Sequence, residues 1–149
     1  MRLVGRPIKP DLTGNYARLC LPYVVARTLL SGSVGLGDFS EALLRDPATH
    51  ALAARVALLG DGNTDENAVV PQRVEIALRD GTVLEQRVEA ALGSPENPLP
   101  RAAQIAKVKA CFAGILPADR AASLVAAIAT LEKMPDAAAS LMTHLVHQP

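Results

Sequence analysis

The sequence predicts an α+β fold, in which a small antiparallel β-sheet of three to four strands is packed with helices before and after it. Three observations predict this class. Apolar residues have helical spacing in the first third of the chain, alternate with polar residues between positions 73 and 90, and return to helical spacing after position 100. Half of the 149 residues are hydrophobic, so a single domain covering residues 1–149 is expected to bury a core.

The longest apolar stretch bounded by helix breakers ends at Gly32. A helix is predicted over residues 22–31, because proline is tolerated at the first helical position and Gly32 can take the left-handed C-terminal cap. Residues 15–21 are then an irregular lead-in. The helical spacing predicts that the buried stripe is Leu21, Val24, Val25, Thr28 and Leu29.

Arg18 and Tyr23 are the candidate binding residues of this stretch. Arg18 stands just before a helix N-terminus, where unpaired N–H groups favour an anion. Tyr23 lies on the first turn and shares a face with Arg27, four residues later. A guanidinium can hold a carboxylate through two parallel hydrogen bonds, and a phenol adds a third. The residues alone leave two interpretations open: a carboxylate site, or two structural side chains.

The middle of the chain predicts short helices followed by a strand. Asp38 is expected to cap a helix that stops before Pro47, and residues 48–54 form one or two further helical turns. Residues 55–60 are aliphatic and bounded by glycine, which favours a strand.

Residues 73–79 and 82–90 are predicted to form a hairpin that turns at Asp80-Gly81. A two-residue loop would place Ile76 opposite Glu85. A three-residue loop over positions 79–81, with Gly81 left-handed, places Ile76 opposite Leu84 and Leu78 opposite Thr82. The second register is predicted because it keeps apolar residues together. It leaves Glu75, Glu85, Arg87 and Glu89 on the solvent face.

The last third of the chain predicts three helices after a proline-rich elbow at residues 93–100. Apolar positions with helical spacing define the first two, and the third covers residues 137–147. The predicted apolar positions are Ile105, Val108, Phe112 and Ile115, then Leu124, Ile128 and Leu131.

Composition argues against several classes of function. The formal net charge is zero, so no broad surface for nucleic acid or an anionic membrane is expected. No apolar run approaches the roughly 18 residues of a membrane span. The two cysteines, Cys20 and Cys111, lack metal-site spacing and are interpreted as reduced thiols in the core of a cytoplasmic protein. His144 and His147 are three apart but have no third ligand, so no metal site is predicted.

Several short motifs occur together in a fixed order. They are Ala17-Arg18, Leu21-Pro22-Tyr23-Val24-Val25-Ala26, Leu29-Leu30-Ser31-Gly32-Ser33-Val34, Asp46-Pro47, Arg79-Asp80-Gly81, Gly93-x-Pro95-Glu96-Asn97-Pro98-Leu99 and Leu131-Glu132. In this order and approximate spacing they resemble the smaller, C-terminal lid domain of the MmgE/PrpD family. That family includes 2-methylcitrate dehydratase, cis-aconitate decarboxylase and iminodisuccinate epimerase. The resemblance runs from about Arg6 to Pro135. One departure is Pro100, where the family often has Ser or Thr.

The resemblance implies a lid that closes over a di- or tricarboxylate substrate of a lyase or epimerase. It implies that Arg18 and Tyr23 line a cleft facing a larger helical domain, which supplies most of the acid and base groups and which these 149 residues do not contain. The chain is then expected to be inactive alone, to have that helical domain as its partner and to need no organic cofactor. Dehydration, decarboxylation and epimerisation all remain open.

The alternative is a stand-alone, non-catalytic binding or oligomerisation module derived from that family. Loss of a neighbouring domain exposes apolar surface, and such patches drive self-association. The candidate residues for a homo-oligomer contact are Leu30, Leu36, Leu141, Leu145 and Val146.

Overall fold

A computed structural model describes residues 4–60, 62 and 69–145, and it confirms the α+β class. The chain divides into unit 1, Met1–Asn63, and unit 2, Thr64–Pro149. Unit 1 is helical, whereas unit 2 has a β-hairpin followed by helices.

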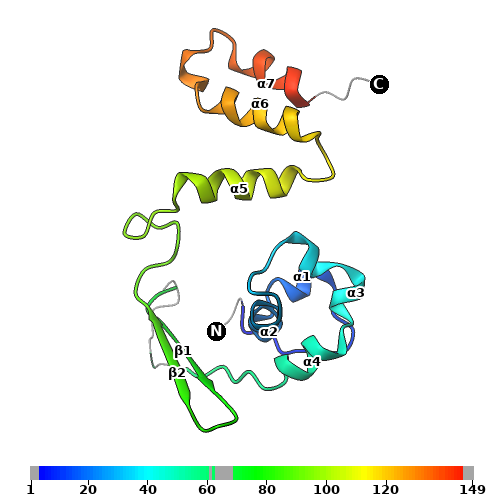
Figure 1. The fold of residues 1–149 in the computed structure, drawn as a ribbon, viewed down its shortest axis with the longest axis vertical. Helices are drawn as coiled ribbons and strands as arrows, with labels where there is room; N and C mark the ends of the chain where they lie inside the picture. The colour runs from blue at the N-terminus through cyan, green and yellow to red at the C-terminus, as the bar shows by residue number, and fades with distance from the viewer. Residues whose placement is uncertain (1–3, 61, 63–68, 146–149) are drawn as a thin grey trace. The chain divides into compact units, whose positions relative to one another are not determined.

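Unit 1 is built around helix α2, Leu21–Ser31, which Figure 1 shows end-on with the other helices of the unit around it. These are α1 (Gly14–Ala17), α3 (Glu41–Leu44) and α4 (Pro47–Ala53), with a 3₁₀ turn, η1, over Leu36–Phe39. The core consists of Leu12, Ala17, Cys20, Tyr23 and Leu44, with Ile8, Tyr16 and Phe39 packed against it.

The ends of α2 agree with the sequence prediction to within a residue. The helix starts at Leu21, has Pro22 in its first turn, and ends at Gly32, which has φ 80°. The lead-in predicted to be irregular instead contains the single turn of α1, which Thr13 caps by accepting the Tyr16 N–H.

The predicted buried stripe of α2 is wrong. Its members Thr28 and Leu29 are exposed, the latter by 49%. The buried residues of the helix are Pro22, Tyr23, Ala26 and Arg27. The neighbouring face of α2 is buried instead, because Tyr23 and Arg27 find hydrogen-bonding partners inside the unit. These partners satisfy the polar atoms of both side chains, which would otherwise be costly to bury. Hydrophobic periodicity alone places an arginine at the surface, because arginine is rarely buried unless it is paired.

The strand predicted at residues 55–60 is also wrong. These residues follow α4, and the N–H groups of Arg55 and Val56 donate back to the carbonyls of Leu52 and Ala53. A strand needs an adjacent strand to accept these donors, whereas here a turn accepts them. In the described part of the chain the sheet therefore has two strands rather than three to four.

The hairpin of unit 2 has the predicted register. Strands β1 (Gln72–Ala77) and β2 (Val83–Val88) are antiparallel, with Ile76 opposite Leu84. The Leu78 N–H donates to the Thr82 carbonyl at 2.8 Å, and Gly81 has φ 87°. The three-residue turn is thus confirmed, because only this loop length keeps the apolar residues of both strands on one face.

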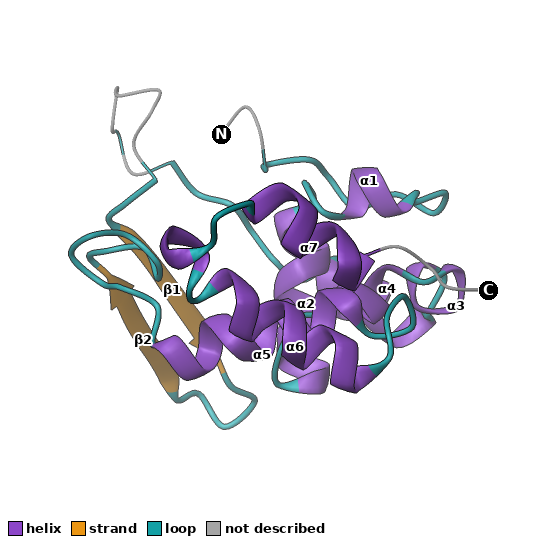
Figure 2. Ribbon diagram, turned by 90° about the horizontal axis from the view of Figure 1, so that it is seen from above, coloured by secondary structure: helices purple, strands orange, loops and turns teal. Residues whose placement is uncertain are grey.

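Helices α5 (Arg101–Phe112), α6 (Ala118–Ile128) and α7 (Ala137–Leu145) complete unit 2. Figures 1 and 2 both show α6 and α7 side by side, and α6 also packs on α5. Gly114, with φ 79°, separates α5 from α6, which leaves Ile115 outside the predicted stripe and 68% exposed. The last part of the helix predicted to reach His147 lies outside the described residues.

Candidate functional site

The two predicted binding residues, Arg18 and Tyr23, both contact Phe39. The guanidinium carbon of Arg18 lies 5.2 Å from the centroid of the Phe39 ring, a cation–π distance. The ring centroids of Tyr23 and Phe39 are 6.0 Å apart, with an interplanar angle of 37°. The fold therefore brings both residues to one aromatic side chain, in the turn η1.

Arg18 is exposed and held from two sides. Its Nη1 donates to Oδ1 of Asn15 at 2.9 Å, while its guanidinium lies over the Phe39 ring. Among the residues that the structure describes, no carboxylate bonds to it. A guanidinium restrained in this way still has N–H donors for an external anion and loses less side-chain entropy on binding one.

Tyr23 is fully buried, and its hydroxyl is already engaged. The hydroxyl donates to the backbone carbonyl of Asp38 at 2.5 Å, and no part of the residue is exposed. Burial is the main reason that the pKa of Tyr23 is raised above its usual value. The phenol therefore stays protonated at neutral pH and acts as a donor. In this arrangement Tyr23 supports the turn that carries Phe39.

A partly buried ionic cluster, centred on Arg27, includes Asp38 of this turn. Its Nε and Nη2 both donate to Oδ1 of Asp38, at 2.9 and 2.8 Å. Its Nη1 donates to Oγ1 of Thr49 at 3.2 Å and lies 3.9 Å from Oδ2 of Asp46. Because Arg27 is only 8% exposed and Thr49 is fully buried, the cluster ties α2 to η1 and to the start of α4 inside the unit.

Sequence reasoning missed this cluster, although it had noted most of its members singly. Tyr23 and Arg27 were predicted to share a helix face, Asp38 to cap a helix, and Asp46 to precede a proline. Asp46 is indeed the cap of α4, where its Oδ2 accepts both the N–H and the hydroxyl of Thr49, at 3.0 and 2.6 Å. The predicted cap role of Asp38 is wrong, because Ser40 is the N-cap of α3 and Asp38 lies within η1, where it accepts the Gly35 N–H. Only the tertiary fold shows that Asp38 and Asp46 face the same guanidinium.

The two carboxylates of the cluster have depressed pKa values. For Asp38 the largest cause is the hydrogen bond from the Gly35 N–H, at 2.8 Å, and the Arg27 guanidinium adds to it. For Asp46 the largest cause is the hydrogen bond from the Thr49 hydroxyl. Both groups therefore stay ionised in the fold at pH values where the unfolded chain begins to bind protons.

Unit 1 is accordingly expected to lose stability in acid. A folded-state pKa below the unfolded value contributes stability that is present above the unfolded pKa, about 3.9 for Asp, and is lost as pH falls through the folded value. Urea unfolding at pH 7, 4 and 3 checks this. In the Asp38→Asn variant the free energy of unfolding should fall less between pH 7 and pH 3 than in wild type. An unfolding free energy that does not fall between pH 4 and pH 3 would contradict the expectation.

His50 and the two cysteines lie outside the Arg27 cluster. His50 places Nε2 2.7 Å from the Leu44 carbonyl, which fixes the end of α3. Cys20 is buried as predicted, and burial raises the pKa of its thiol, whereas the prediction of a core position for Cys111 is wrong because that side chain is exposed. Among the described residues, no group of three or more His, Cys, Asp or Glu side chains is placed to hold a metal ion. His147 lies outside them.

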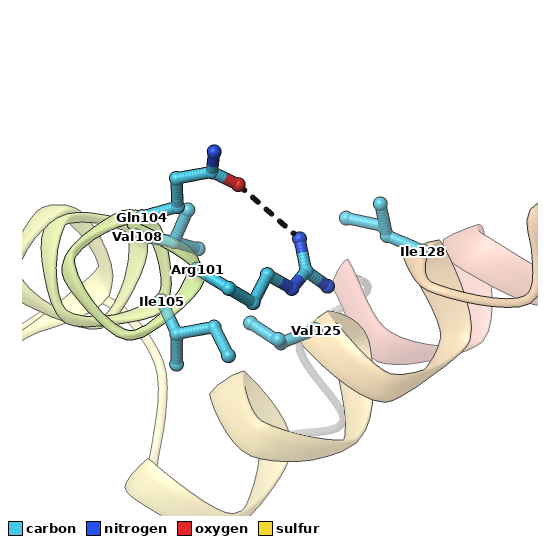
Figure 3. Close-up of a pocket in the computed structure, with 6 residues that line it drawn as sticks. All are labelled: Arg101, Gln104, Ile105, Val108, Val125 and Ile128. Atoms are coloured by element: carbon cyan, nitrogen blue, oxygen red, sulfur yellow. Dashed lines mark hydrogen bonds between the residues drawn. The ribbon is translucent and has the colours of Figure 1, made fainter. Parts of the chain in front are cut away.

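Unit 2 has a shallow hollow between α5 and α6, with a volume of about 110 Å³. Figure 3 shows Arg101 reaching across it from α5, with its Nη1 3.4 Å from Oε1 of Gln104. The floor is aliphatic and is formed by Ile105, Val108, Val125 and Ile128. Neither this hollow nor a second one beside Gly114 includes Arg18 or Tyr23. None of the helices in the described residues has the length and apolar character to cross a membrane.

Comparison with known proteins matches most of the chain to one protein family. A family model described as the MmgE/PrpD C-terminal domain matches residues 1–133. A mouse (Mus musculus) protein named cis-aconitate decarboxylase is 27% identical over 150 residues, covering 100% of this chain and 30% of that protein. A protein of Yarrowia lipolytica (strain CLIB 122 / E 150) named 2-methylcitrate dehydratase, mitochondrial, is 31% identical over 80 residues, covering 48% of this chain and 15% of that protein.

The chain therefore spans less than a third of the length of these curated relatives. The family match covers all of unit 1 and most of unit 2, since it extends from residue 1 to residue 133, in the turn that follows α6. On this match the chain belongs to the MmgE/PrpD family, of which it carries the C-terminal domain.

Proposed function

We propose that the chain is the substrate-capping part of a 2-methylcitrate-dehydratase-like lyase or epimerase that acts on di- or tricarboxylates. Family membership supports this proposal, together with the names of the two relatives, a decarboxylase and a dehydratase. The chain corresponds to 30% of the mouse protein, so the proposal assigns the rest of the active site to a helical part outside it.

Arg18 is the direct carboxylate contact in this proposal, and its placement is the observation that carries it. Its guanidinium is exposed, restrained by Asn15 and Phe39, and free of a carboxylate within the described residues. Arginine matches the planar, two-oxygen geometry of a carboxylate. Tyr23 contributes indirectly, because its ring packs against Phe39 and its hydroxyl donates to the Asp38 carbonyl. A direct bond from Tyr23 to substrate would need its hydroxyl to leave that carbonyl.

The acid–base groups of unit 1 support the view that catalysis needs residues from elsewhere. A lyase needs a positioned acid and base with access to substrate. Asp38 and Asp46 are bonded within the Arg27 cluster, and His50 contacts the Leu44 carbonyl. These three groups have structural partners, and the proposal is therefore that the chain binds an anion but is inactive alone. The proposal includes no organic cofactor.

Arg18→Ala is expected to weaken binding of a tricarboxylate at least about tenfold, because the charge-assisted hydrogen bonds of the guanidinium are lost. Calorimetric titration of the chain with citrate measures this. Arg6→Ala is the matched control, since the Arg6 guanidinium carbon also lies 5.2 Å from an aromatic centroid, that of Tyr16. Equal affinity in wild type and Arg18→Ala would refute the site, as would an equal loss in Arg6→Ala.

The second candidate is a non-catalytic assembly module, favoured by the apolar surface of the chain. Leu30, Leu36 and Leu145 are 47%, 59% and 45% exposed, and exposed apolar patches promote self-association. Leu141 is half-buried, and Val146 lies outside the described residues. Sedimentation of the chain over a range of concentrations tests this candidate, and a single-chain mass throughout would contradict it.

A further inference from the structure

We propose that the free edge of β2 pairs with β2 of a second copy of this chain, forming a four-stranded antiparallel sheet across a two-fold axis at Gln86. In the described residues the sheet has two strands, so each strand has one open edge. A two-stranded hairpin alone is marginal in water, whereas sheets of three or more strands are stable. The inference uses none of the residues of the carboxylate proposal and does not depend on it.

The hairpin's hydrogen bonds determine which residues can pair outward. The Leu78 N–H donates to the Thr82 carbonyl, and inward and outward bonding alternates along an antiparallel strand. Leu84, Gln86 and Val88 therefore bond toward β1. The remaining β2 residues, Val83, Glu85 and Arg87, present their N–H and C=O groups to the open edge.

Like charges face each other within the hairpin. Arg73 stands opposite Arg87, and Glu75 stands opposite Glu85, an arrangement that destabilises a cross-strand pair. Ion pairs offset this repulsion. One is diagonal across the strands, with Arg73 Nε 3.3 Å from Glu85 Oε1. The others run along each strand and join Arg73 to Glu75 and Arg87 to Glu89. The side chains of Glu85 and Arg87 remain 52% and 59% exposed.

A second copy of β2 supplies the missing opposite charges. Two antiparallel registers use the outward-facing residues and overlap most of the strand. Centring on Glu85 would place the Glu85 side chains of the two copies opposite each other. Centring on Gln86 places Glu85 opposite the second copy's Arg87, twice by symmetry, which is the favourable cross-strand pairing. Charge complementarity thus selects the Gln86 register.

The same register continues the apolar face of the hairpin. It places Leu84 opposite the second copy's Val88, on the face that also carries Val74 and Ile76. These side chains are incompletely covered in the structure, with Leu84 51% and Val88 37% exposed. Figures 1 and 2 show β1 and β2 as a single ribbon pair. Pairing therefore extends the charged face with charged residues and the apolar face with apolar ones.

The β1 edge is less suited to this pairing. By the same alternation its outward positions are 73, 75 and 77, preceded by Pro71. Proline has no N–H to donate, and it protects a strand edge from further pairing. A dimer centred on Val74 would lose one hydrogen bond at each end, which leaves β2 as the edge that pairs.

Charge exchange in the full chain tests the register by sedimentation. Wild type should reach twice the single-chain mass at high concentration, and Arg87→Glu should lose this association because Glu85 then faces Glu in the second copy. Within the hairpin, Arg87→Glu removes the repulsion with Arg73, so damage to the fold is not the expected cause. The double variant Glu85→Arg with Arg87→Glu should restore the dimer. A wild type that stays monomeric, or an Arg87→Glu variant that still dimerises, overturns the proposal.

A disulfide tests the position of the axis. Directly opposed, non-hydrogen-bonded residues have Cα atoms about 4.5 Å apart, within reach of a disulfide. In a Cys111→Ser background, Gln86→Cys should cross-link two chains under a mild oxidant, whereas Val74→Cys should not. Cross-linking by Val74→Cys and not by Gln86→Cys would overturn the choice of edge. Arg18→Ala should leave cross-linking unchanged, so failure of the carboxylate site and failure of this interface are told apart.

Discussion

Replacing Arg27 by Met is expected to lower the free energy of unfolding by about 3–5 kcal/mol, the cost of removing one partner from a largely buried ion pair. Arg27 is 8% exposed and makes two hydrogen bonds to Asp38 and one to Thr49. Urea denaturation followed by tyrosine fluorescence measures the loss. Both tyrosines, Tyr16 and Tyr23, lie in unit 1 and the chain has no tryptophan, so the signal reports this unit.

The matched control for this prediction is Arg45→Met. Arg45 pairs with Glu41 at 3.2 Å one helical turn away, and both side chains are mostly exposed, at 67% and 77%. Such a pair contributes no more than about 0.5 kcal/mol. Arg27→Met combined with Asp38→Asn should lose less than the sum of the two single changes, because they share one interaction. Equal effects of Arg27→Met and Arg45→Met would show that the cluster does not hold the unit together.

Replacing Tyr23 by Ala is expected to cost about 3–5 kcal/mol, since it leaves a cavity the size of an aromatic ring in the core. Tyr23 is fully buried, packs against Phe39 and is among the largest buried side chains of the chain. Tyr23→Phe keeps the ring and removes the bond to the Asp38 carbonyl. That variant is expected to cost about 1–3 kcal/mol, the penalty for a buried acceptor without a donor.

Tyr16→Phe is the control for the hydroxyl. The Tyr16 hydroxyl donates to the Pro7 carbonyl at 3.0 Å in an exposed setting, where water can replace it, so a loss below about 1 kcal/mol is expected. Chemical denaturation of Tyr23→Ala, Tyr23→Phe and Tyr16→Phe separates the contribution of the Tyr23 ring to stability from that of its hydroxyl. If Tyr23→Ala were no less stable than Tyr23→Phe, the packing of Tyr23 against Phe39 would not be a source of stability.

The hairpin was predictable from sequence because its information is local. The alternation of apolar and polar residues along the two strands, together with one glycine, determined the predicted loop length. The pairing of Ile76 with Leu84 and the left-handed conformation of Gly81 are both confirmed. Helix ends marked by Pro22 and Gly32 were predictable for the same reason. In each case residues adjacent in sequence carry the constraint.

The inward face of α2 was not predictable in this way. Apolar spacing favoured Val25 and Leu29, but Ala26 and Arg27 are buried instead. The deciding contacts come from Asp38 and Thr49, 11 and 22 residues away from Arg27. Such polar contacts override hydrophobic patterning here, and a single sequence gives no sign that two distant side chains meet one guanidinium.

The candidate site was predictable in part. Arg18 is exposed at the position where sequence placed an anion contact, and its role in binding a carboxylate stays a prediction. Sequence reasoning treated Tyr23 as its direct partner, whereas the structure joins the two through Phe39, which the sequence did not single out. The link is tertiary, because η1 must fold back against α2 before the three side chains meet.

Product formation from 2-methylcitrate and from cis-aconitate tests the central claim, that this chain caps a substrate whose acid and base groups lie in another part of the family's enzymes. The assay is run on the full chain at concentrations where calorimetry shows tricarboxylate binding. The account predicts bound ligand with no product above the rate of buffer alone. Sustained turnover by this chain that Tyr23→Phe abolishes would contradict it, because the catalytic groups would then lie within these 149 residues.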